Sequence, residues 1–401
     1  SISMTQTGFT INDWAFNYCR SLTKVEIGNE VYVGKLAFRY CEALIDITIG
    51  ENCTVNDQAF YHCTSLETLV IPTGTKLGIN VTEGCTNLSN VTVGDDVTIG
   101  GSSANIDFVA GTIEVIIDSN VAESAFKDNV AITSVVIKEG VTSIGNGAFE
   151  NCTALTTVKL PSTLKNIDGS AFYGCTNLTD INLQDTSLEY IGEDGANYRL
   201  GQVFRKCESL QNVILPETLL FMGAHCFSNT ALVNLTIPAS TRLYGSASTG
   251  SQFYSTTSLE SVTFAENSVM TVLPGYVFWD SAVKTVVLPK NITSIGTYAF
   301  NNSGITQLEI PNTVTSIGGS AFSSCKSLTT VTFEEGSVVS SFGERAFKES
   351  SIRSITLPAT ARTFNYYSNT GGSGGGPLAL SGVFSNCADL EQVIFETRED
   401  G

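Results

Sequence analysis

Hydrophobic and polar positions along this chain follow a unit that repeats about every 22 residues. In one copy, apolar side chains occupy Ala148 and Phe149, then Leu155, and then alternate positions at Val158 and Leu160. The alternation at the end of the unit is typical of a β-strand with one buried face. A Pro often follows directly, and because Pro cannot donate a backbone hydrogen bond within a sheet, we expect it to end the strand.

The Phe of this unit recurs along almost the whole chain. Its first three occurrences, Phe16, Phe38 and Phe60, are 22 residues apart, and later ones keep a similar spacing. Thr82 and Ala104 hold the period where the Phe is missing, so the pattern predicts about sixteen turns, most of 22–26 residues. The segment Ala-Phe-x-x-Cys is too short for a full helix, and we expect a short helical or 3₁₀ turn there.

No single turn can bury its own Phe, Leu and Val side chains, whereas stacked turns bury them in one continuous core. We therefore predict a right-handed, mainly β superhelix whose parallel strands form a continuous sheet. We expect a single domain over residues 1–401. The spacing between Phe residues stretches in three places, which predicts loop insertions near residues 190–202, 239–252 and 359–383.

The segment from Thr142 to Pro161, TSIGNGAFENCTALTTVKLP, carries the whole unit. It resembles the BspA-like leucine-rich repeats of bacterial and protist surface proteins, and the likeness extends over nearly the whole chain. The resemblance implies a leucine-rich-repeat solenoid that is secreted or displayed on the cell surface. It also implies a binding role, because some members of that family bind host matrix proteins or mediate adherence.

Composition narrows the classes of partner. Apolar residues make up 42% of the chain, enough for a continuous core, and 39 acidic against 21 basic residues give a formal net charge of −18. Such a chain repels phosphates and anionic lipid headgroups, so we expect no nucleic-acid partner. We find no apolar run long enough to span a membrane and no signal peptide in the sequence. We expect a monomer that binds a protein or glycan, with a host matrix protein among the candidates.

Cysteine and histidine could supply reactive chemistry, but their positions argue against it. Nine of the eleven Cys occupy one slot of the repeat, three residues after the Phe, where a small buried side chain fits. Their Cβ atoms should run parallel, so we expect free thiols, and without a C-x-x-C pair we expect no metal and no cofactor. We expect His62 at the surface, and Cys226, beside His225, replaces the usual core Ala. We therefore expect no enzyme activity.

The predicted strands leave two columns of outward side chains. One column runs from Lys24 through Ser134 to Gln392, and the next includes Glu26 and Glu114. Both consist of small polar, charged and aliphatic residues, without the Trp, Tyr or Arg that are enriched at interface hot spots. This face is either a solvated wall or a weak, extended contact surface.

The three insertions carry the residue types of a recognition surface. Insertions in a solenoid fall on one edge, which is often where ligands bind. Tyr and Arg on loops of a rigid scaffold are typical of recognition surfaces, although aromatic residues can also fasten a long loop to the solenoid. The predicted binding residues are Tyr190, Tyr198, Arg199, Arg242, Tyr244, Tyr254, Arg362, Phe364, Tyr366 and Tyr367.

Three functions are compatible with these patterns. The first is an extracellular or cell-surface module that recognises a protein or glycan and mediates adhesion. The second is a structural stalk that presents another domain, which the plain strand face favours. The third, a hydrolase in the inserted loops, rests only on the acidic residues Glu189, Glu193 and Asp194. Loops that converge on one edge favour binding, and scattered loops favour the stalk.

Overall fold

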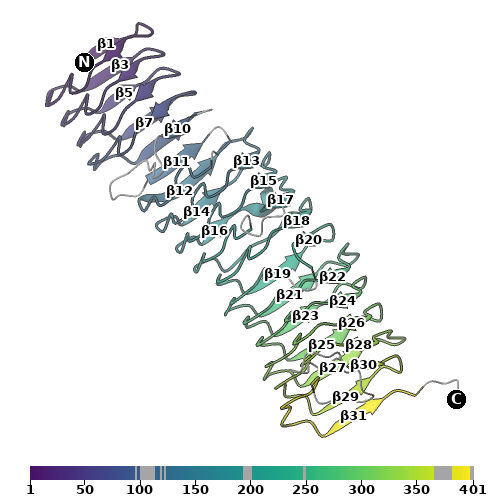
Figure 1. The fold of residues 1–401 in the computed structure, drawn as a ribbon. Helices are drawn as coiled ribbons and strands as arrows, with labels where there is room; N and C mark the ends of the chain where they lie inside the picture. Colours follow the sequence, from purple (N-terminus) through teal and green to yellow (C-terminus); the bar gives the residue numbers. More distant parts are fainter. Residues whose placement is uncertain are drawn as a thin grey trace, which may run out of the picture. The chain divides into compact units, whose positions relative to one another are not determined.

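A computed structural model describes residues 1–94, 97–99, 113–117, 120–121, 123–192, 201–246, 250–364 and 382–397. The chain divides into two compact units: unit 1 comprises Ser1–Leu188 and Cys207–Leu210, and unit 2 comprises Glu189–Lys206 and Gln211–Gly401. Both consist of stacked parallel strands, and the fold is a leucine-rich-repeat β-solenoid of about 14 turns (Figure 1). The additional turn predicted around Ala104 lies outside the described residues.

A series of longer strands forms one side of each unit, with alternate residues buried. In β7 (Thr68–Ile71), Leu69 and Ile71 are buried while Thr68 and Val70 face solvent. The others in unit 1 are β1 (Ile2–Met4), β3 (Lys24–Ile27), β5 (Asp46–Thr48), β9 (Asn90–Val93), β11 (Ile113–Ile117), β12 (Ile132–Ile137), β14 (Thr157–Lys159) and β16 (Asp180–Ile181). Those in unit 2 are β19 (Asn234–Ile237), β21 (Ser261–Phe264), β23 (Thr285–Val287), β25 (Gln307–Ile310), β27 (Thr330–Phe333), β29 (Ser354–Leu357) and β31 (Gln392–Phe395).

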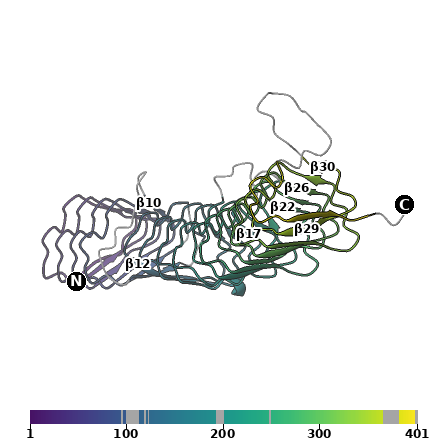
Figure 2. The same ribbon diagram turned by 90° about the horizontal axis from the view of Figure 1, so that it is seen from below.

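A second series, of two-residue strands, lies across the core from the first. In unit 2, for example, β22, β26 and β30 lie on the side opposite β29 (Figure 2). The short strands of unit 1 are β2 (Thr10–Ile11), β4 (Tyr32–Val33), β6 (Thr54–Val55), β8 (Lys76–Leu77), β10 (Thr98–Ile99), β13 (Ser143–Ile144) and β15 (Asn166–Ile167). Those of unit 2 are β17 (Tyr190–Ile191), β18 (Phe221–Met222), β20 (Arg242–Leu243), β22 (Val272–Leu273), β24 (Ser294–Ile295), β26 (Ser316–Ile317), β28 (Ser341–Phe342) and β30 (Thr363–Phe364).

The longer strands do not form the single continuous sheet that the repeat predicts. In unit 1 they form two parallel sheets, β1–β3–β5 and β7–β9–β11–β12–β14–β16, and in unit 2 three, β19–β21–β23, β25–β27 and β29–β31. The two breaks in unit 2 lie before β25 and β29, whose turns have one residue fewer between the Phe and the strand. Strand β23 follows an equally short turn, yet it pairs with β21, and the break between β5 and β7 lies between turns of normal length. The length of the turn therefore does not by itself decide where the hydrogen bonding is interrupted.

Strand β11 corrects the predicted columns of outward residues. Glu114 pairs with Asn90 and Ser134, so it belongs to the first column and not to the second. The register shifts between Ile113 and Glu114, where β11 meets β12. A bulge of this kind absorbs extra residues in one turn while the rest of the strand keeps its buried face, which simple counting from the Phe cannot foresee.

The Phe column forms the centre of the core. Phe149, for example, is fully buried, and its ring stacks on that of Phe126 with centroids 5.2 Å apart and on that of Phe172 at 5.3 Å. In unit 2 the same stacking continues from Phe204 to Phe384, with centroids 5.1–6.3 Å apart. Stacked, nearly parallel rings add specific contacts to the burial of apolar surface.

The expected helical turn around the Phe is wrong. The residues two before and two after the Phe have left-handed backbone, such as Trp14 with φ 62° and Tyr18 with φ 61° around Phe16. Alternate N–H groups bond to the next turn, as in the 2.7 Å bond from Phe16 N to Ala37 O. Because these donors leave their own turn, no helix forms, and the one helix among the described residues is the 3₁₀ segment η1 (Leu183–Asp185).

The Cys slot holds free thiols, as predicted, and the structure adds a reason for them. A thiol in this slot donates to the Phe carbonyl of the preceding turn, over 3.0 Å from Cys152 Sγ to Phe126 O. Burial raises the pKa of Cys152 to about 12 and that of Cys325 to about 11. In the turns without Cys, the Phe126 turn carries Asn129 in this slot and the other described turns carry Ser or Thr; Thr256 donates in the same way to Phe227 O at 3.2 Å.

Candidate interaction surfaces

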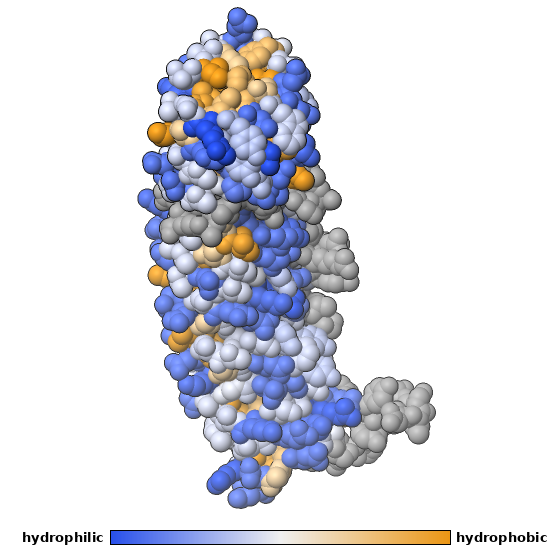
Figure 3. All heavy atoms as spheres, turned by 90° about the vertical axis from the view of Figure 1, so that its left-hand side faces the viewer, coloured by the Kyte–Doolittle hydropathy of each residue, from blue (hydrophilic) through white to orange (hydrophobic). Residues whose placement is uncertain are grey.

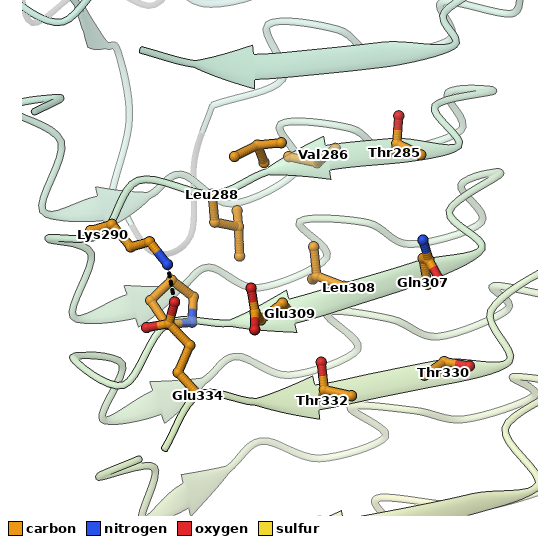
Figure 4. A pocket seen from close by; sticks show the side chains of 12 residues that line it. Thr285, Val286, Leu288, Lys290, Gln307, Leu308, Glu309, Thr330, Thr332 and Glu334 are labelled. Carbon is orange, nitrogen blue, oxygen red and sulfur yellow. Dashed lines mark hydrogen bonds and ion pairs between the residues drawn. The ribbon is translucent and has the colours of Figure 1, made fainter. Parts of the chain in front are cut away.

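A groove of about 480 Å³ crosses the longer strands β23, β25 and β27 of unit 2 (Figure 4). The outward residues of these strands line it, together with residues that directly follow each strand. The lining consists of Thr285, Val286, Val287, Leu288, Lys290, Gln307, Leu308, Glu309, Pro311, Thr330, Thr332 and Glu334.

An ion pair between Lys290 and Glu334 lies at one end of this groove (Figure 4). Its hydrogen bond lowers the pKa of the Glu334 carboxyl and raises that of the Lys290 ammonium, and the charge of nearby Glu309 raises the latter further. Glu334 also accepts the N–H of Asn312 at 3.1 Å. Both partners therefore stay charged at neutral pH, and this end of the groove is polar.

The strand face of unit 2 has the chemistry of a shallow contact surface. The groove lining contains no Cys, His or Ser, and its Glu334 is already held by Lys290. Outward aliphatic side chains occur singly. Val287 is 57% exposed, and Ile214, which lines a smaller groove beside β19, is 66% exposed. On the face shown in Figure 3, hydrophobic residues form one broad group at the upper end and small separate groups among hydrophilic residues elsewhere.

A cluster of aromatic side chains surrounds Arg39 in unit 1; we call it the Arg39 cluster, comprising Trp14, Tyr18, Arg39, Tyr40 and Tyr61. The Arg39 guanidinium carbon lies 4.6 Å from the centroid of the Tyr40 ring and 5.4–5.6 Å from those of the other three rings. The Tyr18 and Tyr40 rings stack with centroids 4.8 Å apart. Trp14 is 47% and Tyr18 48% exposed, so the cluster is open to solvent.

The repeat explains why these side chains meet. Trp14 and Tyr18 lie two residues before and after Phe16, and Tyr40 lies two residues after Phe38, all at left-handed backbone positions. Equivalent positions of successive turns are held side by side by bonds such as that from Tyr18 N to Arg39 O, at 2.8 Å. Aromatic residues at these positions in adjacent turns therefore stack outside the core.

A second aromatic cluster occurs at the same positions in unit 2; we call it the Tyr254 cluster, comprising Tyr254, Tyr276, Trp279 and Tyr298. The Trp279 ring lies 4.9 Å from that of Tyr254 and 5.5 Å from that of Tyr276. Tyr276 and Tyr298 stack at 5.0 Å, and burial raises the pKa of the Tyr276 phenol. All four rings are half-buried, so this cluster offers less open surface than the Arg39 cluster.

Three of the predicted binding residues lie together on the short strands of unit 2. Tyr190 in β17 pairs with Phe221 in β18, and Phe221 pairs with Arg242 in β20. The ring of Tyr244 meets that of Phe221 edge-on at 6.2 Å, which extends the group. Tyr190 and Tyr244 are half-buried and Arg242 is exposed, so aromatic and basic side chains surround Phe221 here, and their role in recognition stays a prediction.

The other predicted residues are distributed differently. Arg362 is exposed just before β30, and Phe364 in β30 stacks on Phe342 at 5.2 Å. Tyr254 lies beside the Phe turn in the Tyr254 cluster, away from the short strands in the repeat. Each inserted segment follows a short strand (β17, β20 or β30), so all three interrupt the repeat at the same place. Four predicted residues lie outside the described part of the chain: Tyr198, Arg199, Tyr366 and Tyr367.

Sequence reasoning missed the Arg39 cluster. Trp14, Tyr18 and Tyr40 lie within regular turns, where the hydrophobic pattern marks only the buried Phe and the strand. The available signal was an aromatic residue two positions from the Phe in consecutive turns. That signal gains meaning only when the left-handed backbone is known to turn these positions outward.

The described residues show no arrangement for catalysis. Nδ1 of the half-buried His225 lies 3.2 Å from the Ser228 hydroxyl, while Cys226 is fully buried in the Ala slot. No group of three or more potential metal ligands occurs in the described ranges. None of the residues described there forms a helix long and apolar enough to cross a membrane. Glu193 and Asp194 lie outside them, and the hydrolase hypothesis gains no support.

Comparison with known proteins points to one family. A profile described as "BspA type Leucine rich repeat region (6 copies)" matches residues 1–106, 119–252, 201–303 and 247–372. The fold is similar to that of a leucine-rich repeat protein from Bacteroides ovatus, with 20% identity and a TM-score of 0.58 over 91% of this chain and 92% of that one. A leucine rich cell surface protein from Faecalibacterium prausnitzii is similar at 17% identity and a TM-score of 0.30, over 97% and 77% of the two chains. No curated protein matches the sequence.

Proposed function

Because the chain belongs to the BspA-type leucine-rich repeat family, we propose that it is a protein-binding module of the cell surface that mediates adhesion. Members of this family are surface-type repeat proteins that interact with other proteins, and leucine-rich-repeat solenoids are typically not enzymes. The ligand is a protein exposed outside the cell, such as a component of a host matrix. The exposed side chains at the edges of the repeats recognise it.

The Arg39 cluster is the observation that carries this proposal. Trp, Tyr and Arg are the residue types most enriched at the energetic centres of protein interfaces. Trp14 and Tyr18 are each about half exposed although their apolar rings would gain from burial. A partner that covers these rings would remove apolar area from water without requiring a change in the solenoid, because Tyr18 is already stacked on Tyr40 and Trp14 already contacts Arg39.

The insertions of unit 2 form a second proposed contact surface. Tyr190 and Arg242 each pair with Phe221, and Tyr244 contacts the Phe221 ring, at the short strands where two of the insertions leave the repeat. Arg362 precedes the third insertion, which contains Tyr366 and Tyr367. Loops on a rigid scaffold commonly carry binding residues, so we propose that this surface adds contacts or a second specificity.

Binding of the purified chain to a panel of immobilised matrix proteins and glycans tests the proposal. We expect saturable binding to at least one protein, lost in a variant with Trp14→Ala and Tyr18→Ala. A second variant, with Arg362, Tyr366 and Tyr367 changed to Ala, measures the contribution of the insertion surface. Glu266→Ala, at an exposed position outside the clusters, the insertions and the grooves, is the control and should bind as the unchanged chain does.

Each variant must retain the unfolding midpoint of the unchanged chain, so that lost binding reports on contact and not on folding. If the folded chain binds no member of the panel, the stalk that presents another domain becomes the better function. If binding persists without Trp14 and Tyr18 but is lost in the insertion variant, recognition belongs to the insertions.

A further inference from the structure

The geometry around Arg39 leaves its hydrogen-bonding capacity unused. The guanidinium carbon lies over the Tyr40 ring, 4.6 Å from its centroid, and 5.4–5.6 Å from the centroids of three further rings. A guanidinium has five N–H donors in its plane, and stacking against rings does not satisfy them. Arg39 is half-buried, so part of its hydration is also removed. Its in-plane donors are therefore available to an acceptor from outside.

Arg39 differs from the basic residues near it, which are paired with carboxylates. Its neighbour Arg20 is paired with Glu42 at 3.4 Å, and Lys24 is paired with Asp46 at 3.1 Å. In the part of the chain that the structure describes, Arg39 forms no ion pair, although the sequence has 39 acidic residues against 21 basic ones. The net charge of −18 repels anions over long distances, but at physiological ionic strength this repulsion is screened beyond about 8 Å. At close range a half-buried cation without a counterion gains most from a carboxylate, which can accept two parallel N–H bonds from the same guanidinium.

We propose that the Arg39 cluster binds an acidic, apolar peptide segment of a protein partner, with a partner carboxylate on Arg39 and an adjacent apolar side chain against Trp14 and Tyr18. This inference rests on the proposed protein-binding function and names the chemistry of the partner. The carboxylate supplies the missing counterion, and the exposed rings supply a surface for the neighbouring apolar group.

The arrangement of the rings favours a peptide over an acidic glycan. A pyranose binds an aromatic residue through an open ring face, whereas Tyr18 and Tyr40 stack on each other. Arg39 lies over the rings of both Trp14 and Tyr40 and occupies further face area. The ring edges and phenol groups remain, and these suit the mixed polar and apolar surface of a peptide.

An array of short peptides, in which glutamate or aspartate alternates with leucine, phenylalanine or proline, provides the probe. Each peptide has a matched copy with the amide in place of the acid. We expect the unchanged chain to bind a subset of the acidic peptides and none of their amide copies. Measured by fluorescence anisotropy with the best peptide, Arg39→Gln should weaken binding at least about tenfold, because a charge-assisted contact is lost.

Three further variants make the test specific. Arg39→Lys keeps the charge but loses the planar pair of donors, and should still weaken binding severalfold. Trp14→Ala should weaken binding of the same peptide while leaving its preference for acid over amide. Arg353→Gln removes an exposed arginine in unit 2 and should have no effect. Equal unfolding midpoints for all variants exclude loss of folding as the cause.

Two results would overturn the proposal. The first is binding to none of the acidic peptides, or equal binding to their amide copies; if the chain still binds a matrix protein through Trp14 and Tyr18, the proposed function stands and this inference alone fails. The second is binding of an oligogalacturonate, but of no peptide, that depends on Arg39, which would assign the site to an acidic glycan instead.

Discussion

At the scale of single residues, each slot of the repeat has a narrow chemical requirement, and exceptions show what the requirement is. The slot three residues after the Phe holds Cys, Ser or Thr in most turns, because each is small and can donate a hydrogen bond to a Phe carbonyl, as Cys152 and Thr256 do. The exception is Asn129, whose side-chain oxygen accepts the N–H groups of Ala131 and Ile132. The Ala slot before the Phe accepts Cys226, which is fully buried. His225, one residue earlier, is a titratable group at a left-handed turn position.

We predict that His225 makes stability depend on pH between about 6.5 and 4. Burial, and then the charge of Arg205, lower the pKa of His225 to about 4 from an unfolded value near 6.5. The folded state therefore disfavours the protonated imidazole. The contribution of His225 to the free energy of unfolding is fully present above pH 6.5 and is lost as the pH falls toward 4. Because the ring is partly exposed, the effect should be on the order of 1 kcal/mol.

Urea unfolding of the unchanged chain and of His225→Gln across this pH range measures the effect. The unchanged chain should lose stability more steeply than the variant between pH 6.5 and 5, before most carboxyl groups titrate. Parallel curves for the two proteins would refute the assignment to His225.

At the scale of the element, the Phe turn is built from left-handed residues held by bonds between turns. Most of these residues are not Gly, and such backbone costs an ordinary residue about 1–2 kcal/mol. The cost is offset because alternate N–H groups bond to the neighbouring turn, as Ser255 N does to Trp279 O at 3.0 Å. Repetition thus stabilises a conformation that an isolated turn would not keep.

Substitution of Ser255, which has φ 53°, tests this account. Ser255→Val should destabilise the chain by about 1–2 kcal/mol, because a β-branched side chain fits left-handed backbone poorly. Ser255→Gly should be neutral or slightly stabilising, since relief of strain offsets the greater freedom of Gly in the unfolded chain. Chemical denaturation gives both values. Equal destabilisation by Val and Gly would show that packing of the Ser side chain, and not the backbone, limits this position.

At the scale of the whole molecule, the net charge of −18 is the dominant electrostatic feature. Like charges repel one another along the stacked turns, and this repulsion opposes the compact state. Several of the ion pairs, such as Lys284–Glu260 at 2.8 Å, are exposed on both sides, and such pairs add little stability in water. Salt should therefore weaken the repulsion among the acidic side chains more than it weakens the attraction within the ion pairs.

We predict that the thermal unfolding midpoint rises as NaCl increases from about 10 mM to about 0.3 M, because the Debye length shortens from about 30 Å to below 10 Å. A variant with Glu30→Gln and Glu51→Gln, which removes two exposed negative charges from adjacent turns, should respond less to salt. Calorimetry of both proteins measures the difference. A midpoint that falls with salt would mean that the exposed ion pairs outweigh the repulsion.

The candidate sites were only partly predictable from the sequence. Tyr190, Arg242 and Tyr244 were identified from the insertions, and the structure places them around Phe221, while their role in binding stays a prediction. Trp14 and Arg39 were not identified, because nothing in a single repeat marks an outward position as special. The cluster exists only where residues of three successive turns stack, and that depends on backbone geometry rather than on the hydrophobic pattern.

The sequence by itself determined the solenoid, the family, the buried Phe and Cys slots and the Pro that ends the strand, because every turn must bury the same apolar positions against its neighbours. Only the tertiary structure decided the left-handed Phe turn, the series of short sheets and the place of Glu114 in the first column. Those features depend on hydrogen bonds between residues about 22 positions apart, which a periodic pattern of burial does not specify. The same bonds set Trp14, Tyr18 and Tyr40 around Arg39, so the surface proposed to bind a partner is a product of stacking.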